Sequence, residues 1–596
     1  MDWAAKHRFN LLSSNFDFTA TWRRVWKKFG VEVPPTSLTA PPFHPWAGWH
    51  QWDIKPPYPE DFQEFIADLI KNFVDYGRKL GMKMAPDYRG FLGQVPKEFY
   101  EAYRDKARFI DVRWGDLATG KFINPIDPLY KEVWKAYLEE YIKRYGTDHI
   151  YACQTLSEME ACETPEEQKE IDISHAKSAL EIIRTVDPQG TFFTLDWTWL
   201  NKKLWQKENV KAYLDTFPED TIVVWGLCAD RGHQWQLYKE LDYYFGKPWL
   251  LGFLVAYGGT TMLHGDLAET IKLVQQVAAD PKAENCLGIS VQPEALRHNY
   301  LHFDLLSRLG WKPSGIELES FLEDYAIRRY GKESAQKMVE CLKELVSSVY
   351  GDTWLTCPLY MFRITNEHMR SGNPYGIHQS KKFLPHLQKA LQIALEESDR
   401  LGDSLFYQHD IIDIARQFLS DLFNLHVARL AMAFRAQDRE AFEREASVLL
   451  DILTSQEMLL SSSDYFCLQP IIDKAMALPN APKDYEQRIR DILTVWADKI
   501  LDYAHKDYYE LVRFYYHPRV DAFIEYLREK LANGSREIKD EELTPLYHKI
   551  EQAWVKKPFK VEKSEKYAGT PVEAATQLLR KHRIGEEELK KIEAME

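Results

Sequence analysis

The first half of the sequence alternates between short apolar runs and amphipathic segments, and this alternation restricts the fold more than any other feature. Seven runs have the length and composition of buried β-strands. They cover residues 10–16, 82–88, 149–155, 191–197, 221–227, 249–257 and 287–291. Apolar residues recur at helical spacing between them, for example in residues 59–81 and 130–146. Strands that alternate with helices in this way predict a parallel sheet.

Seven such units in roughly 300 residues are closer to a (β/α)8 barrel without one of its units than to an open doubly wound sheet, which is the alternative. The first run begins at residue 10, so the missing unit would lie before Met1. From residue 313 onward, amphipathic helical segments follow one another without a strand-like run of comparable strength. We therefore expect a (β/α)8-like α/β barrel lacking its first strand in residues 1–312, followed by an all-α domain in residues 313–596.

Length and composition exclude several classes of protein. A chain of 596 residues is too long for one core. Its net charge of −14 argues against nucleic acid as a partner, and it has no run of about 18 apolar residues that could span a membrane. The start MDWAAKHRFN does not resemble a signal peptide, which favours a cytoplasmic location unless further residues precede it. Association into a homo-oligomer stays open.

The 7 cysteines lack any Cys-x-x-Cys pair, which predicts free thiols rather than disulfides or a zinc site. His298 and His302 have i,i+4 spacing, but no carboxylate stands between them as in a His-Glu-x-x-His zinc motif. We expect them to lie on one face of a helix. The sequence implies no metal and no organic cofactor.

Two glutamates follow predicted strands. Glu294 comes after Pro293 at the end of the run 287–291, and Glu158 follows the run 149–155. Parallel α/β folds place their chemistry at the carboxyl ends of the strands. Each glutamate alone is equally well explained as part of an ordinary acidic turn. Together they indicate the carboxylate pair of glycoside hydrolysis, in which one carboxyl is protonated and the other ionised.

Aromatic residues make up 13% of the sequence and several stand near the same strand ends. They include Trp197, Trp199, Tyr257 and the three tryptophans Trp46, Trp49 and Trp52 of one loop. Such rings can stack on the faces of sugars, although a strand-end tryptophan is also commonly a lid over the core.

Several motifs resemble the α-N-acetylglucosaminidase family, glycoside hydrolase family 89. They are GTDHIY at residues 146–151, Glu158-Met159, Pro293-Glu294, Leu309-Gly310-Trp311, ILDYA at residues 500–504 and Tyr515-Tyr516-x-Pro518-Arg519. The resemblance runs nearly end to end. It implies a (β/α)8 barrel followed by a helical domain that helps to close the active site. It further implies that Glu158 is the general acid/base and Glu294 the nucleophile. Positions implied to line the sugar pocket are Trp46, Ser157, Trp197, Tyr257, Trp496, Ile500 and Tyr503.

The chain also departs from the family pattern. Ser157 replaces the family's Asn, Val255-Ala256 replaces its His-Asn pair, and the small N-terminal domain and first barrel strand have no counterpart. Lost polar groups would leave sugar hydroxyls without partners. The resemblance implies a retaining exo-α-glycosidase acting on terminal α-linked N-acetylglucosamine of a carbohydrate substrate. An α-glycosidase for another terminal sugar and a non-catalytic carbohydrate-binding relative are the alternatives.

Overall fold

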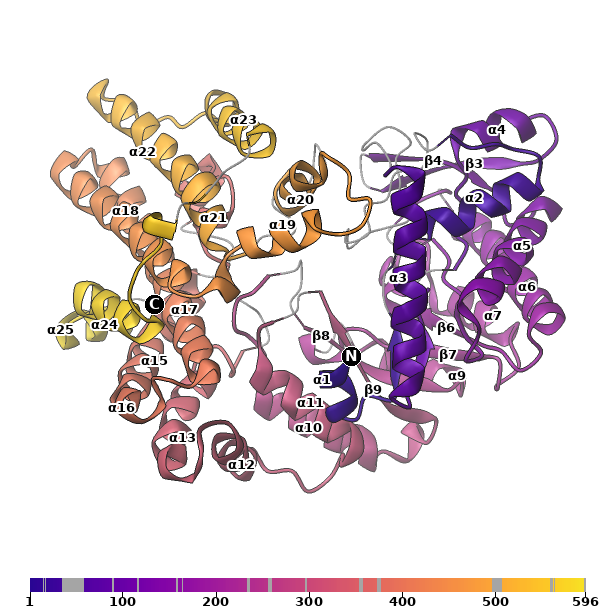
Figure 1. The fold of residues 1–596 in the computed structure, drawn as a ribbon, viewed down its shortest axis with the longest axis horizontal. Coiled ribbons are helices and arrows are strands. Elements are labelled where there is room, and N and C mark those ends of the chain that lie inside the picture. Colours follow the sequence, from indigo (N-terminus) through magenta and orange to yellow (C-terminus); the bar gives the residue numbers. More distant parts are fainter. Residues whose placement is uncertain are drawn as a thin grey trace.

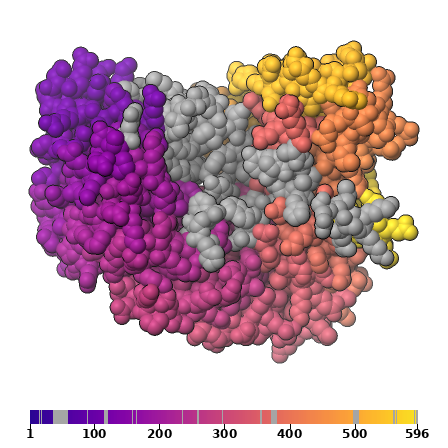
Figure 2. Space-filling view, turned by 180° about the vertical axis from the view of Figure 1, so that it is seen from behind, coloured from indigo at the N-terminus to yellow at the C-terminus, as the bar shows by residue number. Residues whose placement is uncertain are grey.

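The protein has two lobes, an α/β lobe formed by the first half of the chain and an all-helical lobe formed by the second (Figure 1). The two are continuous through the magenta to rose part of the chain, seen at the base of the space-filling view (Figure 2). The computed structural model describes residues 1–13, 16, 18–34, 58–87, 90–114, 117–156, 159–162, 164–232, 236–255, 260–294, 297–352, 357–371, 377–495, 506–557, 561 and 563–593.

Seven parallel strands form the centre of the first lobe, and each of the seven predicted runs overlaps one of them. β1 (Leu11–Ser13) pairs with β2 (Lys83–Ala85). The remaining strands form one sheet in the order β5 (Ile150–Ala152), β6 (Thr191–Leu195), β7 (Ile222–Trp225), β8 (Trp249–Val255) and β9 (Cys286–Pro293). Strand order follows chain order throughout, whereas a doubly wound sheet reverses direction at a switch point. The lobe is therefore a (β/α)8-like barrel.

Helices surround these strands on the outside of the barrel. They are α2 (Thr19–Lys28), α3 (Glu60–Lys79), α4 (Lys97–Tyr103), α5 (Pro128–Tyr145), α6 (Pro165–Val186), α7 (Lys207–Asp215), α8 (Leu237–Glu240), α9 (Asp242–Phe245), α10 (Leu267–Ala279) and α11 (Tyr300–Trp311). Side chains of Asp127, Thr164 and Asp266 cap α5, α6 and α10 by accepting hydrogen bonds from first-turn amides.

The two faces of the strands pack into different layers. Ala85, Ala152, Phe193, Leu195 and Trp225, from four strands, form a cluster inside the barrel. In β8 the residues alternate, with Trp249, Leu251, Phe253 and Val255 in the large core shared with the helices and Leu250 packed on the interior cluster. Alternation of this kind is the expected consequence of the two-residue period of a strand.

An antiparallel hairpin, β3 (Phe109–Trp114) and β4 (Leu117–Ile123), interrupts the alternation and was not predicted. Backbone hydrogen bonds join Arg113 to Glu160 in both directions, at 2.9 and 2.8 Å. Val112 and Phe122 of the hairpin pack with Leu156 and Met159. The hairpin therefore holds both flanks of the loop that follows β5.

A short N-terminal helix, α1 (Asp2–Lys6), contacts two helices on the outside of the barrel, α3 and α11. The Tyr76 hydroxyl of α3 donates to Asp2, and the Trp3 ring meets the edge of Phe303 in α11. Trp311 Nε1 also donates to the Arg8 carbonyl at 2.8 Å. Among the described residues, no ladder joins β9 to β1. α1 thus lies against the helices that flank this seam.

The second lobe contains only helices in its described residues. Apart from short 3-10 turns they are α12 (Leu318–Tyr330), α13 (Lys332–Val346), α14 (Asn366–Ser371), α15 (Ile377–Glu396), α16 (Ser398–Leu401), α17 (Leu405–Ala436), α18 (Arg439–Ser461), α19 (Gln469–Met476), α20 (Tyr485–Leu493), α21 (Tyr509–Leu511), a short π-helix (Val512–Tyr516), α22 (His517–Ala532), α23 (Asp540–Lys556), α24 (Pro571–His582) and α25 (Glu586–Glu593). The 32-residue α17 is buried along most of its length. It forms the centre of this lobe, with α15 and α18 beside it.

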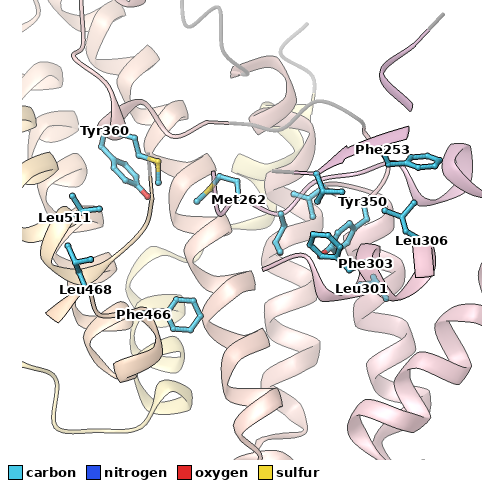
Figure 3. Packing of buried hydrophobic residues seen from close by; sticks show 14 of the residues in the cluster. Phe253, Met262, Leu301, Phe303, Leu306, Tyr350, Tyr360, Phe466, Leu468 and Leu511 are labelled. Carbon is cyan, nitrogen blue, oxygen red and sulfur yellow. The ribbon is translucent and has the colours of Figure 1, made fainter. Parts of the chain in front are cut away.

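One hydrophobic core continues across both lobes. It extends from Phe253 of β8 through Met262 and Leu301 to Tyr360 and Leu511 of the helical lobe (Figure 3). Because these side chains belong to one cluster, burial of apolar surface contributes to holding the lobes together.

Candidate active site at the carboxyl ends of the strands

Glu294 lies at the carboxyl end of β9, as the sequence predicted. Its side chain is partly buried, and its backbone N–H donates to the Val255 carbonyl at the end of β8, at 3.1 Å. Buried Asn299 ties the loops after these strands together, because its amide contacts the backbone of His264 at 3.2 Å and Met262 at 3.3 Å. Asn299 has a left-handed backbone, with φ of 51°. Such strain persists where the surroundings fix it, as they do in this loop.

Two further side chains interact electrostatically with the Glu294 carboxylate. One is the buried Cys228 thiol after β7, whose pKa is raised well above its usual value, chiefly by burial and then by Asp230. The other is Lys506 of the helical lobe, whose pKa burial lowers to about 8 against the opposing influence of Glu294. Glu294 is therefore located where the barrel meets the helical lobe, with a cation among its neighbours.

Two buried carboxyl groups, which sequence reasoning missed, lie close to this region. Burial raises the pKa of Asp196 to about 7, and its carboxylate accepts a hydrogen bond from the Tyr244 hydroxyl at 2.8 Å. Burial likewise raises the pKa of Asp230 to about 6, against the adjacent Arg231. Asp196 directly follows β6, at the carboxyl end of a strand, a position that could have marked it. Both side chains are buried.

Glu158 and Ser157 lie outside the described residues, but the chain on either side of them is fixed. Leu156 and Met159 are buried against the β3–β4 hairpin. The loop that carries Glu158 is therefore anchored directly after β5, in the same sheet whose far strand carries Glu294.

Among the positions implied to line the sugar pocket, Trp197 is the one that the structure describes. It lies in the 3-10 turn η2 (Asp196–Leu200), which directly follows β6, and its side chain is partly exposed. Its ring packs both on the interior barrel cluster and on the cluster of Leu227, Cys228 and Leu254. Because Cys228 also interacts with Glu294, the structure brings Trp197 and Glu294 to the same end of the barrel. The remaining predicted positions lie outside the described residues: Trp46, Tyr257, Trp496, Ile500 and Tyr503.

The helical lobe reaches the strand ends through a buried polar network around Thr261, in the loop after β8. The Asp507 amide donates to Thr261 Oγ1 at 3.3 Å, and the Arg416 guanidinium of α17 donates to the Thr261 carbonyl. Gln417 accepts a hydrogen bond from the Leu263 amide at 3.0 Å. These contacts fix the start of the helical lobe's loop 506–508 against the barrel.

A second contact between the lobes lies at α20. The Tyr485 ring meets the edges of Tyr58 and Phe62, with centroids 5.5 and 5.2 Å away. Tyr58 and Phe62 stand at the start of α3, so the first residue of α20 contacts the barrel near the start of that helix.

Two expectations from the sequence are wrong. Val255, which replaces a polar residue of the family pattern, is fully buried among the outer core residues of β8, so its side chain does not face the barrel interior. His298 precedes α11 instead of sharing a helical face with His302. Both histidines are buried, and burial lowers the pKa of His302 to about 4.

Within the described ranges, no group of three histidine, cysteine or carboxylate side chains could hold a metal ion. All seven cysteines are free thiols, as expected. None of the helices in the described part of the chain is long and apolar enough to cross a membrane.

Comparisons with known proteins agree with this architecture. The family model of the α-N-acetylglucosaminidase TIM-barrel domain matches residues 1–313, and that of the C-terminal domain of the same family matches residues 321–581. The human α-N-acetylglucosaminidase is 25% identical over 557 residues, covering 90% of this chain and 72% of the human one.

Two solved structures of a family 89 glycoside hydrolase from Clostridium perfringens share the fold. The complex with PUGNAc aligns at a TM-score of 0.79 and 20% identity, over 97% of this chain and 66% of that one. The complex with GlcNAc-α-1,4-galactose aligns at a TM-score of 0.81 and 20% identity, over 99% and 67%. The chain thus spans about two thirds of the length of these bacterial relatives. With two consecutive family models matched over most of its length, the chain belongs to the α-N-acetylglucosaminidase family of glycoside hydrolases.

Proposed function

We propose that the protein is a retaining exo-α-glycosidase that removes terminal α-linked N-acetylglucosamine from glycans. In this mechanism Glu294 attacks the anomeric carbon and forms a covalent glycosyl-enzyme. Glu158 protonates the leaving oxygen and then takes a proton from the water that releases the sugar. A retaining pair of carboxyl groups stands about 5–5.5 Å apart.

The observation that carries the proposal is the placement of Glu294. It stands at the carboxyl end of a barrel strand, partly open, with its amide held by β8 and a cation from the helical lobe nearby. A nucleophilic carboxylate must be ionised, and a nearby cation favours that form. Glu158 would act from the loop after β5, whose flanks are buried against the hairpin.

The sugar follows from the family and from the human relative, which is named for α-N-acetylglucosamine. The buried position of Val255 weakens one argument for another sugar, because this departure from the family pattern falls in the core. Ser157 and Ala256, outside the described residues, keep that alternative open.

The experiment compares release of nitrophenol from α-N-acetylglucosaminide, α-glucoside and α-galactoside by the unsubstituted protein and by Glu294→Gln. We expect preference for the N-acetylglucosaminide, and a loss in kcat on the order of 10⁴-fold or more in Glu294→Gln. Glu284→Gln is the matched control, because Glu284 is an exposed glutamate just before the opposite end of β9. It should leave kcat unchanged.

Three results would redirect the proposal. Undiminished turnover by Glu294→Gln contradicts the nucleophile assignment. Preference for another glycoside supports the alternative sugar. Binding of N-acetylglucosamine without hydrolysis of any substrate supports a non-catalytic carbohydrate-binding relative.

A further inference from the structure

We propose that Lys506 is a positioning residue for this reaction, and that its ammonium group is the counter-charge that holds the Glu294 carboxylate in its ionised form. The inference rests on the proposed function and assigns part of the nucleophile's environment to the helical lobe.

The backbone around Lys506 is held on both sides. The buried Tyr516 hydroxyl accepts from the Lys506 amide at 3.4 Å and lies 3.1 Å from the Lys506 carbonyl oxygen, to which it donates. The next residue, Asp507, is buried, and its carboxylate accepts from the Tyr360 hydroxyl at 3.0 Å and from Gln456 Nε2 at 3.2 Å. These hydrogen bonds fix the position of the Lys506 backbone, from which its side chain extends.

The same segment is attached to the loop that leads from β8. The Asp507 amide binds Thr261 Oγ1 at 3.3 Å. Thr261 follows Val255 by six positions, and the Val255 carbonyl accepts the Glu294 amide at 3.1 Å. Asp507, the neighbour of Lys506, and Glu294 itself are thus attached to residues six positions apart, and the charges of Lys506 and Glu294 interact across the boundary between the lobes.

Other charged groups surround this pair. On the barrel side, Asp230 and Arg231 after β7 and Asp196 after β6 act electrostatically on the Cys228 thiol. Glu294 acts on the same thiol. On the helical side, Arg416 faces Asp507 and Tyr508, and Arg297 of the loop after β9 also acts on Tyr508. Asp507 is engaged by Tyr360, Gln456 and Arg416, and Glu294 acts electrostatically on Lys506.

The charge on Lys506 has a definite pH window. Burial lowers its pKa from 10.5 to about 8, so the ammonium persists at neutral pH and is lost as pH rises through 8. Opposite charges favour each other's charged form. Removal of Lys506 should therefore raise the pKa of Glu294, and removal of the Glu294 charge should lower the pKa of Lys506.

The first test measures kcat/KM against pH for the unsubstituted protein, Lys506→Met and Lys506→Arg. In Lys506→Met the acid limb should move upward by about 1 pH unit, so kcat/KM at pH values below the limb should fall about tenfold. Lys506→Arg should keep the acid limb and move any alkaline limb near pH 8 upward, because arginine does not deprotonate there. A folded Lys506→Met variant whose acid limb stays in place overturns the proposal.

The second test needs no turnover. Protein labelled with [ε-¹³C]lysine is titrated by NMR, and the Lys506 signal is assigned by its absence from Lys506→Met. We expect a midpoint near pH 8 that falls by about 1 unit in Glu294→Gln. An unchanged midpoint shows that the two groups are uncoupled and overturns the inference. A shifted midpoint in a protein without glycosidase activity supports the charge pair and rejects the proposed function, so the two failures are distinguishable.

Discussion

Replacing Arg416 with methionine should destabilise the junction between the lobes by about 3–5 kcal/mol at pH 7, the usual result of removing one partner of a buried ion pair. Arg416 is 2% exposed, pairs with Asp413 at 2.8 Å and donates to the Thr261 carbonyl. It also acts on Asp507. Methionine keeps much of the volume but leaves two buried carboxylates without this cation.

The predicted loss depends on pH, and its sign follows from the two carboxyl groups. Burial raises the pKa of Asp413 and of Asp507 from 3.8 to about 6, even though Arg416 opposes the shift. Such groups stabilise the folded state fully below pH 3.8, and lose that contribution as pH rises through 6. Each shift of about 2 units corresponds to roughly 3 kcal/mol at pH 7.

Without Arg416 the folded-state pKa values of Asp413 and Asp507 rise further, so the stability of the variant keeps falling to a higher pH than that of the unsubstituted protein. The difference in stability between the two proteins should be largest near pH 8. It should shrink to about 1–2 kcal/mol near pH 4, where neutral carboxyls need no cation and mainly the Thr261 carbonyl lacks its donor.

Urea unfolding followed by tryptophan fluorescence at pH 4, 6 and 8 measures this difference. The control is Arg528→Met, which removes an exposed pair with Glu443 at 2.7 Å and should change stability by no more than about 0.5 kcal/mol. A loss below about 1 kcal/mol at pH 8, or one that does not vary with pH, would refute the reasoning about this network.

Two further outcomes follow from the barrel. Gly252→Ala should push β7 away from β8 and destabilise the protein by more than about 4 kcal/mol, because a Cβ there would stand 1.5 Å from the Gly226 carbonyl oxygen. Gly288→Ala has open space around its Cβ and should cost only about 1–2 kcal/mol, because alanine disfavours its φ of 148°. Thermal unfolding of the two variants measures the difference. Glu158→Gln should lower kcat/KM for a disaccharide by about 10²–10⁴-fold but leave kcat/KM for dinitrophenyl glycosides nearly unchanged, because their leaving group needs no proton. An equal loss of kcat/KM on both substrates would count against a general-acid role.

Much of the fold could be predicted because its signals are local. The runs that became β6 and β8 are continuous, β-branched or aromatic stretches with helical patterns on either side. The hairpin was missed although Ile110 to Trp114 alternates in polarity and a Gly-Asp pair follows, which is a turn signal. An antiparallel hairpin inserted between two barrel units does not follow from the alternation of strands and helices that predicts the parallel sheet.

The surroundings of the candidate site depended on tertiary structure. Glu294 could be predicted because it ends a strand and falls on a family motif. Lys506 could not, since its partner is 212 positions away by the numbering and the contact forms only when the lobes meet. The orientation of Val255 likewise depends on strand register, where a shift of one residue exchanges the two faces.

The central claim is that Glu158 and Glu294 act on one glycosidic linkage from opposite sides. The measurement that tests it most directly is the anomeric configuration of the N-acetylglucosaminyl azide formed when azide rescues Glu158→Ala and Glu294→Gly on an activated α-glycoside. If Glu294 forms the covalent intermediate and Glu158 serves the other face, Glu158→Ala should yield the α-azide and Glu294→Gly the β-azide. The same anomer from both variants, or an α-azide from Glu294→Gly, would contradict the account.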